Sequence, residues 1–127
     1  MIGFSGCFQY PEGPIFTLMM KDERINGNWK LVEYIDSNGE DVSSEHQNET
    51  LTIIVDRSGN KTWQEFVDAV RVNLATFQFA DHSNYIIVEY GAEGQSAYQR
   101  FYDIKKLTEK EFKYVTDEGN TLDYKKY

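Results

Sequence analysis

Three side chains in the sequence could act as a catalytic nucleophile, a general base or a metal ligand: Cys7, His46 and His82. A nucleophile needs a base within hydrogen-bond reach, and a metal site needs several convergent ligands. His46 lies in a polar stretch between two glutamates, and His82 lies in a segment of turn-forming residues. No Ser/His/Asp spacing favours a catalytic triad. We therefore expect both histidines to be solvated turn residues, and we predict no enzymatic activity, no metal site and no cofactor.

Residues 36–41, Asp-Ser-Asn-Gly-Glu-Asp, gather oxygen ligands that suit calcium. An EF-hand loop needs glycine at its sixth position and glutamate at its twelfth. Here Gly39 is fourth, and the twelfth residue is Gln47. Because Asn38-Gly39 is a strong hairpin signal, the segment is predicted to be a turn.

Length and charge exclude several classes of protein. The chain has 127 residues, which suits one domain, and its formal net charge is -8. A nucleic-acid partner, which is bound through clustered lysine and arginine, is therefore not expected. No run of about 18 apolar residues could span a bilayer as a helix. The single cysteine cannot form an internal disulfide.

Short apolar runs separated by turn signals predict antiparallel strands from Gly27 onward. The predicted strands cover residues 29–36, 50–56, 75–79, 85–90, 97–104, 111–116 and 121–127. Alternation places Trp29, Leu31, Glu33 and Ile35 on one face of the first strand. Residues 62–73 fit both a helical period and a period of two, so an eighth strand is predicted there, with a short helix as the alternative.

Eight strands of about nine residues with short connections account for the roughly 100 residues after position 26. This count predicts an all-β fold, a small up-and-down eight-stranded antiparallel barrel, with a β-sandwich as the alternative. The dense aromatic and aliphatic residues of the strands would fill such a barrel. The candidate lining residues are Leu31, Leu51, Ile53, Val55, Phe77, Phe79, Tyr90, Phe101, Phe112 and Tyr114.

The two ends of the chain carry a family resemblance. Residues 10–14 read Tyr-Pro-Glu-Gly-Pro, Gly27-Asn28-Trp29 follows, and residues 102–108, 111–114 and 122–126 form a terminal hairpin pattern. Together they resemble the small lipocalin-like lipoproteins of Bacteroidetes, which implies a calycin-type barrel. In lipocalins at large, the tryptophan of the first strand closes one end of the barrel under an arginine from a late strand. The resemblance gives Gly27 and Trp29 this architectural role. Lys125 and Lys126 are the cations of the last strand, and Arg100 is the nearest late arginine.

Residues 4–7, Phe-Ser-Gly-Cys, resemble a lipobox, which implies lipid attachment at Cys7 and an outer-membrane address in the cell envelope. Only six residues precede Cys7, so the gene is expected to encode further upstream residues with a basic start and an apolar segment. Residues 1–6 are then the remnant of a signal, 7–26 a flexible tether and 27–127 the barrel domain. If the motif is accidental, Cys7 is a plain thiol and the protein is cytoplasmic.

The resemblance implies a non-enzymatic envelope lipoprotein domain that holds a small apolar ligand in its barrel. The alternative is a protein-interaction module whose packed barrel presents loops to an envelope partner. A weaker alternative is an enzyme subunit or inhibitor that uses the acidic surface. An internal cavity of about 300 Å³ or more, open at one end, would favour the ligand carrier, and a packed interior would favour the interaction module.

Overall fold

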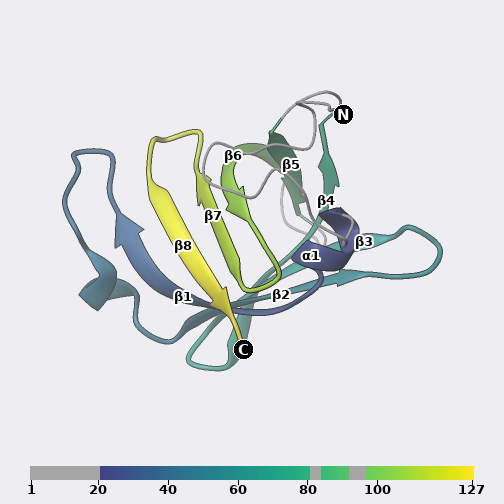
Figure 1. Cartoon of the computed structure of the whole chain (residues 1–127), viewed down its shortest axis with the longest axis horizontal. Coiled ribbons are helices and arrows are strands. Elements are labelled where there is room, and N and C mark those ends of the chain that lie inside the picture. Colours follow the sequence, from purple (N-terminus) through teal and green to yellow (C-terminus); the bar gives the residue numbers. More distant parts are fainter. Residues whose placement is uncertain (1–20, 81–83, 92–96) are drawn as a thin grey trace.

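The computed structural model describes residues 21–80, 84–91 and 97–127, and within them the chain is almost entirely β-structure (Figure 1). One short helix and one 3₁₀ helix accompany eight strands. The elements are α1 (Lys21–Ile25), β1 (Gly27–Ile35), η2 (Ser43–His46), β2 (Glu49–Val55), β3 (Lys61–Val67), β4 (Val70–Phe79), β5 (Tyr85–Tyr90), β6 (Tyr98–Leu107), β7 (Glu111–Val115) and β8 (Thr121–Lys126).

The eight strands form a closed antiparallel barrel in chain order. Each strand pairs with the next, and β8 returns to pair with β1, with Trp29 opposite Lys126 and Leu31 opposite Tyr124. Figure 1 shows β8 beside β1, where the barrel closes. Closure leaves no unpaired edge between the first and last strands, which a two-sheet sandwich would have. The predicted up-and-down barrel is therefore confirmed, and the sandwich alternative is wrong.

The eighth strand lies in the segment where the sequence was ambiguous. Residues 62–73 belong to a hairpin in which Val67 of β3 pairs with Val70 of β4, so the short-helix alternative is wrong. The two linking residues, Asp68 and Ala69, have φ angles of 51° and 65°. Such a mirror-image turn matches the twist of the flanking strands but usually contains glycine. Because Asp-Ala is a weak turn signal, the sequence did not separate β3 from β4.

A bulge in β1 changes which residues face the interior. The pairing with β8 shifts between Leu31 and Glu33, so the alternation that begins with Trp29 does not continue. Glu33 is exposed, whereas Tyr34 packs against the core. The prediction that Glu33 shares a face with Trp29 and Leu31 is therefore wrong, because one extra residue reverses the side-chain direction beyond it.

The helix α1 covers one end of the barrel. Ile25 and Arg24 are buried, and the Arg24 guanidinium donates a hydrogen bond to the backbone carbonyl of Leu107 (2.9 Å). The Trp29 indole N–H donates to the backbone carbonyl of Ile25 (2.8 Å). Residues 21–25 are therefore an integral part of the barrel, which corrects the prediction that the flexible tether extends to residue 26. Residues 7–20 of that segment lie outside the described part of the chain.

Lys126 completes this closed end. Its ammonium lies 4.8 Å from the centre of the Trp29 ring and donates to the backbone carbonyls of Arg24 and Asn26, at 3.0 Å each. Gly27 has a φ of 142°, and a Cβ atom there would lie 3.2 Å from Cε of Lys126. A larger residue at position 27 would therefore crowd the lysine. The cation over the tryptophan is thus Lys126, in the place where the resemblance implies an arginine.

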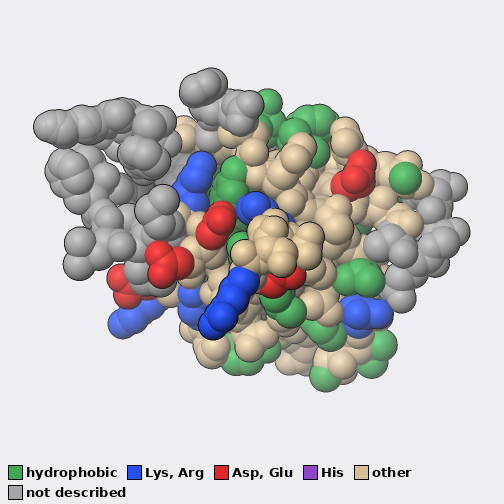
Figure 2. All heavy atoms as spheres, turned by 90° about the vertical axis from the view of Figure 1, so that its right-hand side faces the viewer, with side chains coloured by type: hydrophobic (Ala, Val, Ile, Leu, Met, Phe, Trp, Pro, Cys, Tyr) green, Lys and Arg blue, Asp and Glu red, His purple; other side chains and the backbone are tan. Residues whose placement is uncertain are grey.

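The side of the molecule that carries α1 faces the viewer in Figure 2. Acidic and basic side chains are intermixed over its described part, so this face does not present a field of one sign. Within the described segments, no helix is long and apolar enough to cross a membrane.

Candidate functional site

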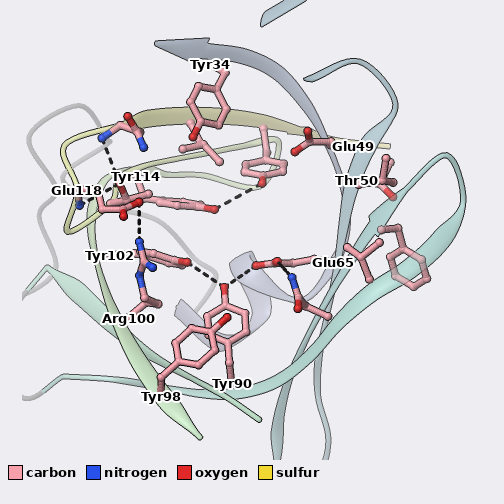
Figure 3. Close-up of a pocket in the computed structure, with 18 residues that line it drawn as sticks. Tyr34, Glu49, Thr50, Glu65, Tyr90, Tyr98, Arg100, Tyr102, Tyr114 and Glu118 are labelled. Atoms are coloured by element: carbon pink, nitrogen blue, oxygen red, sulfur yellow. Dashed lines mark hydrogen bonds and ion pairs between the residues drawn. The ribbon is translucent and has the colours of Figure 1, made fainter. Parts of the chain in front are cut away.

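A pocket of about 240 Å³ lies at the end of the barrel opposite α1. Residues from all eight strands contribute to its walls, together with the β7–β8 turn (Figure 3). Six tyrosines are the most frequent lining residue: Tyr34, Tyr90, Tyr98, Tyr102, Tyr114 and Tyr124. The charged lining residues are Glu49, Glu65, Arg100 and Glu118. This combination of aromatic and charged groups makes the pocket the candidate binding site.

Glu65 of β3 is the central polar group. Its carboxylate accepts hydrogen bonds from the Trp63 indole N–H (2.7 Å), the Asn73 amide (2.8 Å) and the Tyr90 hydroxyl (2.5 Å). Figure 3 shows Glu65 pointing toward Tyr90 and Tyr102 in the middle of the pocket. Three donors from β3, β4 and β5 therefore fix the carboxylate in one orientation, which is the preorganisation that a binding site needs.

The tyrosine hydroxyls form a directed chain that ends at Glu65. The Tyr90 hydroxyl proton is donated to Glu65, and the Tyr90 and Tyr102 oxygens are 2.8 Å apart. Because each phenol has only one proton, Tyr102 must donate to Tyr90. Burial raises the pKa of the Tyr90 phenol, and the Glu65 carboxylate raises it further. Burial also raises the pKa of Tyr102. Both phenols therefore stay protonated at neutral pH and keep this direction of donation.

A column of stacked tyrosine rings packs against the hydroxyl chain of Tyr90 and Tyr102. Tyr102 and Tyr114 stack with ring centres 4.7 Å apart, and Tyr114 stacks on Tyr124 at 5.9 Å. The Tyr114 and Tyr124 hydroxyl oxygens are 3.4 Å apart. Burial raises the pKa of both phenols, as it does for Tyr90 and Tyr102. The column holds rigid rings from β6, β7 and β8, so the pocket wall is preformed.

Arg100 lies at the rim. Its guanidinium pairs with Asp117 (3.0 Å) and with Glu118 (2.8 Å), both on the β7–β8 turn. Two carboxylates thus offset one guanidinium, and the arginine holds the turn against β6.

Tyr34 and Glu49 also line the pocket, and His46 contacts both of them. The His46 imidazole stacks on the Tyr34 ring with centres 3.9 Å apart, and its Nδ1 atom lies 2.6 Å from a Glu49 carboxylate oxygen. The prediction that His46 is a solvated turn residue is therefore wrong. The 3₁₀ helix η2 holds the His46 ring against Tyr34 of β1. His82 lies outside the described residues.

The candidate lining residues divide between the two halves of the barrel. Tyr90 and Tyr114 line the pocket. The buried core below it contains Leu31, Leu51, Ile53, Phe77 and Phe112, and Val55 and Phe79 pack against this core. Phe101 is a correction, because it is 44% exposed and contacts Tyr85 on the outer face. Gly27 and Trp29 lie at the closed end, and Cys7 lies outside the described part.

The candidate lining residues omit four that build the site: Trp63, Glu65, Tyr102 and Tyr124. Trp63 is fully buried at the centre of the core, in edge contact with Phe77 and Phe112. Residues two apart in a strand share a face, so an inward Trp63 also places Glu65 inward. This alternation was the signal in the sequence that could have identified Glu65. A charged residue is ordinarily assigned to the solvent face, so only the burial of Trp63 reveals it.

The predicted turn at residues 36–41 is present. The Asp36 carboxylate accepts hydrogen bonds from the backbone N–H groups of Asn38 and Glu40, and Gly39 has a φ of 84°. Asp36 therefore caps its own turn with the oxygen that a calcium ion would need. Over the described ranges, no group of three or more His, Cys, Asp or Glu side chains could hold a metal ion.

Among solved structures, a lipocalin-like protein from Bacteroides uniformis ATCC 8492 is similar to this chain, with a TM-score of 0.59 and 11% sequence identity. The likeness covers 82% of this chain and 99% of that chain. No protein-family model and no curated protein matches the sequence. At this identity the likeness concerns the fold alone. The closed eight-stranded barrel, the helix over one end and this neighbour together show that the chain has a lipocalin-like fold.

Proposed function

We propose that the protein is a non-enzymatic binding protein that takes a small organic molecule into the pocket at the open end of its barrel. The observation that carries this proposal is the Glu65 carboxylate, which three donors from three strands fix in place among tyrosine hydroxyls. Even the partial burial of a charged group costs free energy that a purely apolar core would avoid. We attribute the position of this carboxylate at the open end of the barrel to ligand recognition.

The size of the pocket limits the ligand. A volume of about 240 Å³ is below the roughly 300 Å³ expected of a carrier with an open internal cavity, and below the range of about 300–1,000 Å³ that drug-sized ligands occupy. Size alone therefore favours the interaction module, and the case for a ligand rests on the polar groups of the pocket. The interior beneath it is filled by Trp63, Phe112 and their neighbours, so a long acyl chain or a polycyclic molecule has no room to extend. The ligand therefore has the size of one substituted ring or a short branched chain.

The polarity of the walls also shapes the proposal. The resemblance implies an apolar ligand, whereas phenol hydroxyls, carboxylates and the Asn73 amide line this pocket. An apolar molecule would leave these groups without the hydrogen bonds that water gives them. We therefore propose a ligand with polar groups of its own.

The test is an amide NMR titration of the protein with small aromatic and aliphatic compounds that carry neutral, cationic or anionic groups. Binding is expected to shift the resonances of β3, β5 and β6 around Glu65, Tyr90 and Tyr102. Val72→Trp should abolish these shifts, because Val72 lines the pocket and is 48% exposed. Val70→Trp is the matched control, because Val70 lies on the same strand and does not line the pocket.

The proposal is contradicted if no compound shifts the pocket resonances, or if both tryptophan variants bind like the wild type. It is equally contradicted if the shifts gather on the outer face around Phe101.

A second candidate function is the protein-interaction module. The exposed valines of the β3–β4 hairpin favour it: Val67 and Val72 line the edge of the pocket, and Val70 pairs with Val67. This candidate predicts that a photo-crosslinker placed at position 70 in living cells yields one discrete protein adduct. The same group at Arg57, in the β2–β3 turn, should give none. Equal labelling from both positions would argue against it.

We also propose that the domain is anchored to the cell envelope, at the outer membrane, through lipid on Cys7. The support is the Phe-Ser-Gly-Cys sequence at residues 4–7. Metabolic labelling of the protein expressed from its native gene with an alkyne fatty acid tests this directly. Label should appear on the wild type and disappear in Cys7→Ser. Absence of label from the wild type would refute the anchor and leave the binding proposal untouched.

A further inference from the structure

Most of the hydrogen-bond donors around Glu65 are already committed within the protein, although the Asn73 amide, which gives one N–H to the carboxylate, has a second. Tyr90 donates to Glu65, Tyr102 donates to Tyr90, and the indole of Trp63 also donates to the carboxylate. Each of these groups has a single proton to give. What they leave toward the pocket are lone pairs on the carboxylate and on the phenol oxygens. This part of the pocket is therefore rich in acceptors, and a ligand that fits it must bring donors.

The charges of the pocket also favour a ligand that brings hydrogen-bond donors. Its described lining holds three acidic side chains, Glu49, Glu65 and Glu118, and one basic side chain, Arg100. Arg100 is engaged by Asp117 and Glu118, and Glu49 faces His46. In the described segments, Glu65 has neutral hydrogen-bond partners only. A carboxylate held in a partly desolvated site without a basic partner attracts a cation from solution.

The aromatic walls suit an organic cation in particular. Tyr90 stacks on Tyr98 at 5.0 Å, and Tyr102 stacks on Tyr114 at 4.7 Å, so phenol rings flank Glu65 from β5 and β6. Tyrosine rings attract ammonium groups electrostatically and bury the carbon atoms beside them. Figure 3 shows Tyr90, Tyr98 and Tyr102 gathered on the same side of the pocket as Arg100, facing Glu65.

Other ligand classes fit less well. An anion would meet the Glu65 carboxylate, while the guanidinium that could bind it is held by two carboxylates at the rim. A neutral polyol carries as many acceptors as donors, and among the groups that donate to Glu65 no more than the second N–H of the Asn73 amide remains for its acceptors.

We propose that the pocket selects a small organic ammonium ion, whose N–H groups donate to the Glu65 carboxylate and to the neighbouring phenol oxygens. This proposal rests on the proposed binding function and names the class of its ligand. The ammonium nitrogen lies beside Glu65, and the carbon substituent packs against the tyrosine rings.

Isothermal titration calorimetry with three matched probes tests the selection: benzylamine, benzyl alcohol and benzoate share one ring and differ in charge. At neutral pH the protonated amine is expected to bind at least about tenfold more tightly than the alcohol, because charge-assisted hydrogen bonds are the stronger ones. Benzoate should bind weakest. The preference for the amine should shrink as salt is added.

Glu65→Gln should reduce the affinity for benzylamine about tenfold or more and leave the affinity for benzyl alcohol nearly unchanged. Glu89→Gln is the matched control and should leave the affinity for benzylamine unchanged, because Glu89 is exposed on β5 and does not line the pocket. Amide spectra of both variants check that they are folded. If Glu65→Gln does not fold, the comparison of the three probes on the wild type decides the question.

Equal binding of amine and alcohol would overturn the ammonium selection while the binding function stands. Full retention of the amine preference in folded Glu65→Gln would also overturn it. Failure of all three probes and of glycerol, a neutral polyol, to bind would contradict the binding function as well. Tighter binding of glycerol than of benzylamine would replace the ammonium with a neutral ligand.

Discussion

The Tyr90 hydroxyl on β5 donates a 2.5 Å hydrogen bond to the Glu65 carboxylate on β3, two strands that are not neighbours in the barrel. The bond crosses the interior behind β4 and ties the two walls of the pocket together. It is therefore both a structural link and the feature that aims Glu65 into the pocket.

Tyr90→Phe should destabilise the fold by about 1–2 kcal/mol, because Glu65 loses one donor and Tyr102 loses its acceptor. Tyr98→Phe is the control, since Tyr98 stacks on Tyr90 but is exposed. Its loss of a hydroxyl should cost less than about 0.5 kcal/mol. Urea unfolding followed by tryptophan fluorescence measures both. Equal costs in the two variants would mean that the hydroxyl chain does not contribute to stability.

Trp29→Ala should cost about 3–5 kcal/mol, a large part of the stability of so small a domain. The variant loses the contact with Phe112, the hydrogen bond to Ile25 and the seat of Lys126. Val32→Ala, an exposed change on the same strand, should cost well under about 1 kcal/mol. A thermal midpoint for Trp29→Ala within a degree or two of the wild type would show that this end of the barrel is not closed by the indole.

Ala69→Gly should stabilise the protein by roughly 0.5–1 kcal/mol. Ala69 has a φ of 65°, where its Cβ atom is strained by about 1–2 kcal/mol. The relief exceeds the entropic cost of glycine, which is about 0.5–1 kcal/mol. Ala75→Gly, in the buried middle of β4, should destabilise instead. A lower thermal midpoint for Ala69→Gly would show that the hairpin turn is not in the left-handed conformation.

Most of the strands were predictable from the sequence, but one hairpin turn and one bulge were not. Glycine and asparagine turn signals revealed seven strands, and the candidate lining residues Leu51 and Ile53 of β2 are buried. The hairpin turn at Asp68-Ala69 was not predicted, because the twist of the flanking strands imposes positive φ angles on two residues with little turn preference. The β1 bulge escaped because side-chain alternation gives no sign of an inserted residue.

The candidate site was only partly predictable. Tyr90 and Tyr114 were among the candidate lining residues and line the pocket. Phe101 was chosen instead of its neighbour Tyr102, because the sequence alone does not say which of two adjacent aromatics points inward. The register of β6 with β5, which places Tyr102 opposite Ile86, decides for Tyr102. Glu65 was missed because a carboxylate is ordinarily a surface residue, and its three donors come from segments that only the closed barrel brings together.

Asp123→Asn should change how stability depends on pH. Burial and the neighbouring Glu111 carboxylate raise the pKa of Asp123 to about 6. The folded protein therefore binds a proton that the unfolded chain has lost, and the stability that this proton adds disappears as the pH rises through about 6. Although burial opposes it, hydrogen bonds from Lys125 and Lys106 lower the pKa of Glu111 to about 2, so Glu111 stays ionised throughout this range.

An asparagine at position 123 carries no charge at any pH, so the thermal midpoint of Asp123→Asn relative to the wild type should rise between about pH 5 and pH 7.5. Asp103→Asn is the control, because it removes an exposed carboxylate from the outer face of β6. Calorimetric scans at both pH values give the two differences. A difference for Asp123→Asn that does not change with pH would show that the Asp123 carboxyl is ionised at both.

The most direct test of the binding account is a set of intermolecular nuclear Overhauser effects on the wild-type protein saturated with benzylamine. Contacts are predicted between the methylene protons of the ligand and the ring protons of Tyr90 and Tyr102, the two phenols whose hydroxyl chain ends at Glu65. Contacts confined to the outer-face rings of Tyr85 and Phe101, or no contacts at saturation, would contradict the account.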